Sequence, residues 1–318
     1  MAGDFKAQPE DHHISILGNG DVLTLFKDGS KSLISSTPDG RRETSFSDPK
    51  GVMVRTDIDA DGITFLRQGQ PDAIGNIAGK CEAAARDGQP SACASVKLDA
   101  DPSHQPGGDN DMGHVVLKAN KGPHDFLLMP NAPITGIEDP RASAPDAHNY
   151  FADAWTDARQ KLAENLGTTA DALPRDAVGL AVNSLGGRTQ DRLHIHTDLL
   201  DDALRAKLEG EVPKLDGSWK PLGFDVNGHH YDAMWVNGEQ LKDNPFKLVH
   251  DRLASQYGED YARTHMDQQS LVVVGATKPD GTKGFAIVAG RMNPDQRHFD
   301  KGSSEEWLQG RPFDGKFS

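Results

Sequence analysis

Short runs of alternating hydrophobic and polar residues fill roughly the first 70 positions, a pattern typical of narrow β-strands. Asp21–Phe26 and Ser32–Ser35 flank an Asp-Gly pair, a dipeptide that favours a tight hairpin. Two further runs, Gly51–Arg55 and Ile63–Arg67, are separated by another Asp-Gly turn. We therefore predict a small β-meander and assign residues 1–72 to a β-rich N-terminal extension.

The pattern changes after this extension. Residues 83–111 are rich in Ala, Asp, Gly and Pro, which predicts a long loop or crossover. Tyr150–Leu166 has apolar residues on one helical stripe, and Asn149 before it is a good N-cap. The other predicted strands and helices are His114–Leu117, Phe126–Met129, Val178–Asn183, Arg192–Thr197, Asp201–Leu208, Tyr231–Val236, Asn244–Tyr257, Gln269–Ala276 and Gly284–Ala289. This order predicts an α+β fold with an antiparallel sheet over residues 73–318.

Charge and hydropathy limit the partners. The chain has 34 basic and 48 acidic residues, a formal net charge of −14, so a nucleic acid or an anionic membrane surface is not an expected partner. No apolar run is long enough to span a bilayer, and the first residues lack the apolar core of a signal peptide. We expect no transmembrane segment and at most transient membrane contact, and the location stays open between cytoplasmic and secreted or delivered.

The two cysteines, Cys81 and Cys93, allow two interpretations. Two thiols cannot complete a four-ligand zinc site, and their spacing is not that of a redox motif. A local disulfide and two free thiols both remain open.

The segment Leu193–Asp198 carries the strongest chemical signal. On a strand, alternation places His194, His196 and Asp198 on one face and aliphatic residues on the other. The preceding loop contains Gly186-Gly187, whose bare backbone can approach an anion closely. The sequence therefore predicts a reactive row beside an anion-binding loop.

Three interpretations of this row compete. A metal site would use His194 and His196 with a further ligand from Asp198, His229 or His230. Covalent catalysis would use one histidine as a nucleophile on phosphorus, with its other ring nitrogen fixed by a hydrogen bond. The third interpretation is an exposed polar strand face with two incidental histidines.

The spacing of four residues favours the covalent interpretation; these are Asn183, Gln190, His194 and His196. Their arrangement resembles the signature strand of the histidine-triad superfamily, in which an asparagine, a glutamine and a row of histidines line a nucleotide α-phosphate. Other segments, in the same order, resemble the CDP-diacylglycerol pyrophosphatase branch: Gly113–Lys118, Phe126–Pro130, Ile134–Pro140, Asn149–Trp155, Leu180–Ser184, Gly187–Gln190 and Gly228–Tyr231. The resemblance runs from about residue 81 to about residue 291 and implies a histidine-triad fold, an antiparallel sheet with flanking helices.

The resemblance implies hydrolysis of a nucleotide phosphoanhydride through a nucleotidyl-histidine, without a metal or other cofactor. A CDP-diacylglycerol-like substrate would give CMP and phosphatidate. Registering on Asn183 and Gln190 makes His196 the nucleophile, and this register is preferred; a row that begins at Arg192 makes it His194. Asp198 stands where the superfamily often has a third histidine. This departure matters, because a carboxylate at that position would repel phosphate.

The resemblance also distributes the other roles. Arg188, Arg192 and Lys118 are the candidate cations for the charge on phosphorus, Asn183 and Gln190 the residues that orient the α-phosphate, and His229 the candidate acid for the leaving group. The expected partner is a nucleotide-containing small molecule or a liponucleotide.

Two alternatives stay open. One is another histidine-triad activity, a nucleotidyl transferase or lyase acting on a soluble or protein substrate, for example as a delivered bacterial effector. The other is a non-catalytic protein that binds a nucleotide, or a protein partner through residues 1–70.

Overall fold

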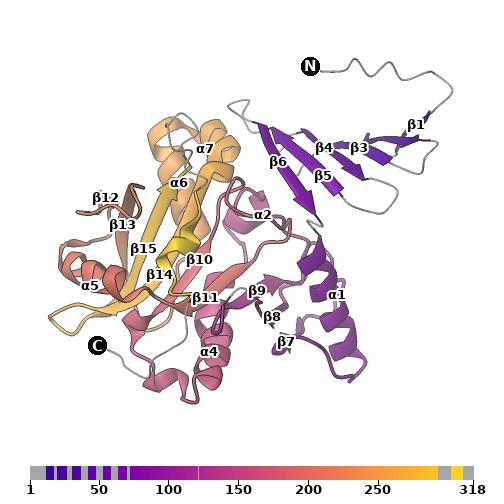
Figure 1. The fold of residues 1–318 in the computed structure, drawn as a ribbon. Helices are drawn as coiled ribbons and strands as arrows, with labels where there is room; N and C mark the ends of the chain where they lie inside the picture. The colour runs from indigo at the N-terminus through magenta and orange to yellow at the C-terminus, as the bar shows by residue number, and fades with distance from the viewer. Residues whose placement is uncertain are drawn as a thin grey trace. The chain divides into compact units, whose positions relative to one another are not determined.

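The computed structural model describes residues 12–17, 20–26, 31–36, 42–47, 53–58, 64–69, 72–120, 122–292 and 302–310. Contacts between residues divide the chain into two units, Met1–Pro71 and Asp72–Ser318, and each is described by itself. Figure 1 shows the strands of the first unit and the helices and strands of the second. In the part of the chain that the structure describes, every helix is too short or too polar to cross a bilayer.

The first unit is a meander of antiparallel strands, each paired with the next along the chain. They are β1 (His12–Ile16), β2 (Val22–Phe26), β3 (Lys31–Ser36), β4 (Arg42–Ser47), β5 (Met53–Ile58) and β6 (Thr64–Gly69). β2 and β3 form the pair expected on either side of the first Asp-Gly, with Val22 opposite Ile34. The turn itself, residues 27–30, lies outside the described residues.

The second unit is built on a nine-stranded antiparallel sheet in the order β12-β13-β15-β14-β10-β11-β9-β8-β7. The strands are β7 (Ser95–Lys97), β8 (His114–Lys118), β9 (Phe126–Pro130), β10 (Val178–Val182), β11 (Ile195–Leu199), β12 (Lys220–Pro221), β13 (Tyr231–Asn237), β14 (Gln269–Thr277) and β15 (Lys283–Arg291). The predicted class, α+β with a large antiparallel sheet, is confirmed.

Helices cover both faces of this sheet (Figure 1). They are α1 (Ala73–Arg86), α2 (Pro140–Ser143), α3 (Tyr150–Asp153), α4 (Arg159–Asn165), α5 (Asp202–Glu211), α6 (Pro245–Tyr257) and α7 (Glu259–His265). The helix predicted over 150–166 is α3 and α4 joined by a π-helical turn, Ala154–Ala158. Short 3₁₀ turns include η3 (Arg175–Ala177), η4 (Val212–Lys214) and η6 (Ser304–Trp307).

Strand alternation divides the core into two layers. Ile195 and Leu180 pack with α3, α4 and α6 on one face, in the larger apolar cluster. Ala181, Leu200 and Trp307 belong to a second cluster on the opposite face, which α5 covers. Because successive side chains of a strand point to opposite faces, His196 shares the face of the second cluster.

The prediction of a loop over residues 83–111 is wrong at the start and in the middle of that range. Helix α1 runs through Arg86, and β7 adds an edge strand to the sheet. A disulfide joins Cys81 to Cys93, with the Cα atoms 6.0 Å apart. Cys81 packs with Val115 and Met129 in a small third cluster, so α1 is fixed to the outer strands by both packing and a covalent bond.

Candidate active site

Two histidines stand at the beginning of β11, on the face that carries Trp307. The ring centroids of His194 and His196 lie 5.1 Å apart, with the rings inclined at 66°. His196 is buried and pairs with Leu127 of β9 across the sheet. The strand alternation expected from the sequence therefore brings the two rings together.

His194 is held in one tautomer. Its Nδ1 lies 2.7 Å from the backbone carbonyl oxygen of Arg192, and since a carbonyl only accepts, Nδ1 must carry the proton. Burial lowers the pKa of the His194 imidazole, and the neighbouring charge of His196 lowers it further, to about 3. At neutral pH this ring is therefore uncharged, with the lone pair on Nε2.

His196 has the opposite character. Its Nδ1 lies 3.2 Å from Oδ2 of Asp125, and its Nε2 lies 3.2 Å from Oε1 of Glu305. Burial alone would lower the pKa of His196, but the hydrogen bond to Asp125 and the ion pair with Glu305 outweigh it and raise that pKa to about 9. The ring is an imidazolium at neutral pH, and a fixed cation beside a neutral histidine results.

Asn183 connects the histidines to the C-terminal segment. Its Nδ2 donates to Oε1 of Glu305 at 2.6 Å, and its Oδ1 accepts from the backbone nitrogen of Ser304 at 2.9 Å. Trp307, fully buried in the second cluster, anchors the same turn, η6. The carboxylate of Glu305 is therefore held beside His196 by packing of its turn and by backbone contacts.

The predicted cation Arg188 is buried and engaged by acids. Its Nη2 donates to Oε1 of Glu138 at 2.6 Å and lies 3.5 Å from Asp191, and its Nη1 donates to the other oxygen of Glu138. Gly136 makes room for this guanidinium, because a Cβ there would collide with Nη1. Arg188 is thus rigidly placed, with its charge offset by two carboxylates.

Arg192, Gln190 and Lys118 contact backbone atoms. Arg192 donates to the carbonyl oxygen of Asn131 at 3.2 Å, and burial lowers the pKa of its guanidinium. Oε1 of Gln190 accepts from the nitrogen of Ile74 at 3.2 Å. Nζ of Lys118 donates to the carbonyl oxygens of Gly122 at 2.8 Å and Asp125 at 3.1 Å. These contacts hold the three side chains against backbone, and the phosphate-binding roles predicted for them stay predictions.

The comparisons with known proteins agree with this geometry. A family model for CDP-diacylglycerol pyrophosphatase matches residues 69–311. The CDP-diacylglycerol pyrophosphatase of Yersinia pestis is 32% identical over 218 residues, which cover 68% of this chain and 74% of that protein.

The chain belongs to the CDP-diacylglycerol pyrophosphatase family.

Membership confirms the predicted family and the predicted enzyme class, a phosphoanhydride hydrolase. It also confirms the reaction, hydrolysis of CDP-diacylglycerol to CMP and phosphatidate. For a CDP-diacylglycerol pyrophosphatase, a neutral histidine next to a fixed cation is a suitable arrangement, because the α-phosphorus needs a nucleophile and its oxygens need a charge.

His229 lies in the loop just before β13, where its side chain contacts Glu306. Its Nδ1 lies 2.9 Å from Oε1 of Glu306, which also accepts from the hydroxyl of Tyr231 at 2.6 Å. His229 and His196 therefore contact neighbouring glutamates of one turn, η6. The acid role predicted for His229 stays a prediction.

Asp198, the departure from the histidine row, is buried beside Lys118. Burial raises the pKa of its carboxyl, and the charge of Asp125 adds to this, giving about 7 in spite of the hydrogen bond from the Leu199 nitrogen. Near neutral pH a large fraction of Asp198 is protonated, which reduces the repulsion expected between this position and a phosphate.

Sequence reasoning missed three acids of the candidate site: Asp125, Glu138 and Glu305. Asp125 stands just before β9, and Glu305 lies in a short C-terminal turn. No spacing rule connects them to the histidines, because the contacts arise only when distant segments pack together. The one available signal was a general one, that a buried imidazolium or guanidinium needs an acidic partner.

One cluster of described residues has the composition of a metal site. Nε2 of His114 lies 2.8 Å from Asp157, its Nδ1 lies 3.3 Å from Asp153, and Nζ of Lys97 lies 3.5 Å from Asp153. Burial opposes a charge on His114, but its close contacts with Asp153 and Asp157 raise its pKa. With two cations next to two carboxylates, the cluster is balanced as an ion-pair network that joins the π-helical turn to β8.

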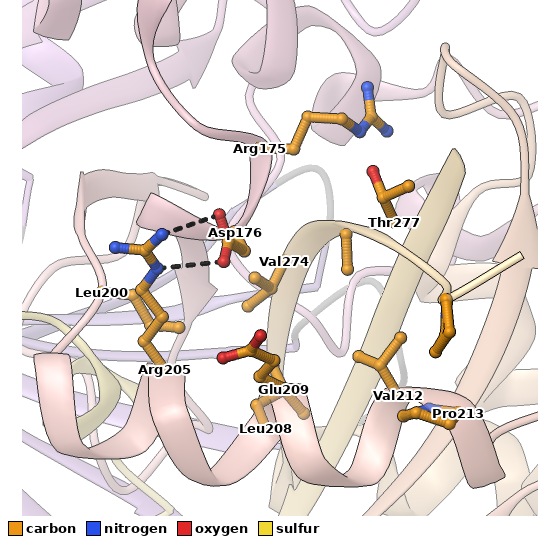
Figure 2. Close-up of a pocket in the computed structure, with 12 residues that line it drawn as sticks. Arg175, Asp176, Leu200, Arg205, Leu208, Glu209, Val212, Pro213, Val274 and Thr277 are labelled. Atoms are coloured by element: carbon orange, nitrogen blue, oxygen red, sulfur yellow. Dashed lines mark hydrogen bonds and ion pairs between the residues drawn. The ribbon is translucent and has the colours of Figure 1, made fainter. Parts of the chain in front are cut away.

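A separate pocket of about 480 Å³ lies between α5 and β14 (Figure 2). Leu208, Val212 and Val274 line it, and the ion pair of Arg205 with Asp176 stands at one side. It opens on the same sheet face as His196, but no residue of the predicted site lines it. The histidine cluster is therefore the candidate active site of this pyrophosphatase.

Proposed function

We propose that this enzyme cleaves CDP-diacylglycerol by covalent catalysis, with Nε2 of His194 as the nucleophile on the α-phosphorus, in a sheet of histidine-triad type. The observation that carries the proposal is the bond from Nδ1 of His194 to the carbonyl oxygen of Arg192. It fixes the proton on Nδ1, so Nε2 presents a lone pair at neutral pH.

The sequence register that begins at Arg192 is the one that the geometry supports, in place of the register preferred from spacing. His196 is unsuited to attack phosphorus, since its two nitrogens face Asp125 and Glu305 and it holds a proton. As an imidazolium it serves instead as the cation for the α-phosphate oxygens, which gain charge in the transition state.

In the first step Nε2 of His194 forms a bond to the α-phosphorus. The bond from this phosphorus to the bridging oxygen breaks, and the electron pair leaves with phosphatidate. Asn183, whose amide donates to Glu305 beside His196, is proposed to orient an α-phosphate oxygen. Arg188, Arg192, Lys118 and Gln190 are proposed to shape the phosphate site, and His229 to act on the leaving group.

We assign this chemistry to residues 73–318 and treat residues 1–72 as an accessory module, a candidate surface for a protein partner. We propose that the lipid portion of the substrate is reached by transient membrane contact. Transfer of the nucleotidyl group to another acceptor, and binding without turnover, are the competing outcomes of the experiment below.

The test is direct detection of the intermediate. Enzyme is mixed with radiolabelled CDP-diacylglycerol in detergent micelles, quenched in alkaline denaturant to protect a phosphorus–nitrogen bond, and digested for peptide mass spectrometry. We expect a cytidylyl group that fragmentation of the peptide locates on His194 and not on His196, and CMP and phosphatidate as products in buffer with EDTA.

Matched variants assign the roles. His194→Ala should abolish the adduct and turnover, whereas His196→Ala should slow adduct formation at least about a hundredfold and leave its position unchanged. His230→Ala is the control, because the side chain of His230 is 80% exposed. An adduct on His196, or full turnover by His194→Ala, contradicts the proposal.

A further inference from the structure

The carboxylate of Glu305 forms an ion pair with His196, and the first step assigns no proton transfer to it. Oε1 of Glu305 lies 3.2 Å from Nε2 of His196 and accepts from Nδ2 of Asn183 at 2.6 Å. It therefore lies between the two groups that are assigned to the α-phosphate. The ring centroids of His194 and His196 are 5.1 Å apart, so we place a phosphorus bonded to Nε2 of His194 close to the His196 ring and to its Glu305 partner.

Hydrolysis requires a second step, which needs a base. Once phosphatidate has left, a water molecule must attack the nucleotidyl-histidine, and its proton must go to a nearby group. His196 is a poor acceptor, because its two nitrogens already face carboxylates that favour its protonated form. A carboxylate is therefore the group to look for.

Three carboxylates surround the histidines, and only their placement separates them. Asp125 faces Nδ1 of His196, on the ring edge away from Nε2, and its side chain is 8% exposed. Asp198 is buried and accepts from the nitrogen of Leu199. Glu305 faces the Nε2 edge, and its side chain is 29% exposed, so among these three it is the one that water reaches readily.

The turn that carries Glu305 is built to hold this position. Oγ of Ser304 donates to the carbonyl oxygen of Val182 at 2.7 Å, and the nitrogen of Ser184 donates to the carbonyl oxygen of Gly302 at 3.0 Å. Trp307 is fully buried below the turn. Fixed backbone on both sides of one partly exposed carboxylate is the arrangement expected of a preorganised catalytic group.

We propose that Glu305 is the general base of the second step, an inference that rests on the proposed intermediate at His194. The water oxygen forms a bond to the α-phosphorus as the bond from phosphorus to Nε2 of His194 breaks, and that electron pair returns to Nε2. The water proton passes to the Glu305 carboxylate, CMP leaves, and the proton is then released to solvent.

The decisive variant is Glu305→Gln, which keeps an oxygen for the amide of Asn183 but cannot take a proton. Phosphatidate should appear in a burst of about one equivalent per enzyme, followed by a steady rate at least about tenfold below wild type. The cytidylyl adduct on His194 should accumulate. Glu259→Gln, whose original side chain is 75% exposed on α7, is the control with unchanged kinetics.

A second variant separates chemistry from structure. In Glu305→Ala, added formate should restore the release of CMP, because a small carboxylate can replace the missing base; a purely structural glutamate would not be rescued. Thermal unfolding of each variant reports folding separately.

The outcomes distinguish the two claims. If wild type gives a trapped adduct on His194 but Glu305→Gln shows no burst and normal turnover, the base assignment fails and the intermediate stands. If Glu305→Gln turns over faster than wild type, the carboxylate only obstructs the phosphate site. If no enzyme form yields an adduct, the intermediate itself fails.

Discussion

Oδ2 of Asp125 lies 3.2 Å from Nδ1 of His196, on the ring edge opposite Glu305. The imidazolium therefore has a carboxylate at each nitrogen, although only Glu305 is reached by water to any extent. Asp125 thus fixes the charge and the orientation of a ring that must act on phosphate. This relationship predicts how activity depends on pH.

Asp125→Asn should move the alkaline limit of activity to lower pH. The pKa of His196 is raised to about 9, so the protonated ring is present below that pH and is lost above it. Removal of the Asp125 charge lowers this pKa, so kcat/KM should fall at a lower pH than in wild type, and at pH 8 the loss should be about tenfold or more. Initial rates between pH 6 and pH 10 measure it.

The control for this pH profile is Asp251→Asn, at a side chain that is 52% exposed on α6. Its profile should overlay that of wild type. An unshifted alkaline limb in Asp125→Asn would show that the protonation of His196 does not govern catalysis.

Asp198→Asn should stabilise the protein at alkaline pH. The pKa of Asp198 is raised from 3.8 to about 7 in the folded state, so stability is fully present below pH 3.8 and is lost as the pH rises through 7. The variant avoids this loss, so its free energy of unfolding at pH 8 should exceed that of wild type by about 2 to 4 kcal/mol, because one pKa unit corresponds to about 1.4 kcal/mol.

Urea denaturation at two pH values tests this sign. At pH 8 the variant should unfold at a higher urea concentration than wild type, and at pH 4, where Asp198 is protonated, the two midpoints should approach each other. A variant less stable at pH 8 would mean that the charged carboxylate and its Leu199 contact stabilise the fold.

Local pattern was enough to predict the histidine row and the sheet class. The alternation of His194 and His196 with aliphatic residues has the period of a strand, and the face that it implies is the one observed. The choice of nucleophile could not be predicted in the same way. Both registers use the same residue types, and the bond from His194 to the Arg192 carbonyl depends on a side-chain rotamer and not on spacing.

The acids of the site and helix α1 depend on tertiary contacts. Asp125 is 71 residues from His196 in the chain, and Glu305 is 122 residues from Asn183, so no local window contains both partners. Glycine inside a helix weakens the helix signal. Gly75 of α1 is such a case, and it lies where a Cβ would come within 3.3 Å of Nε of Arg192.

Glu138→Gln should destabilise the enzyme through Arg188. Both side chains of this ion pair are 3% exposed, so a neutral partner leaves a buried guanidinium with less compensation. Breaking a buried pair from one side costs about 3 to 5 kcal/mol. A double-mutant cycle with Arg188→Met and Glu138→Leu, followed by urea denaturation, should give a smaller loss for the double variant than the sum of the single losses. Additive losses would show that the pair has no net coupling.

Reduction of the Cys81–Cys93 disulfide should lower stability and loosen one wall of the site. The bond closes a loop with a sequence separation of 12, for which loop entropy predicts about 3 kcal/mol. The disulfide fixes α1, and the backbone nitrogen of Ile74 in this helix donates to Gln190. Reduction should therefore also lower activity at temperatures near the unfolding transition. Thermal unfolding with and without dithiothreitol measures the effect. The double variant Cys81→Ser, Cys93→Ser should unfold at the same temperature as reduced wild type, and reductant should not change that temperature. Equal unfolding midpoints for oxidised and reduced wild type would mean that packing of Cys81 alone holds the helix.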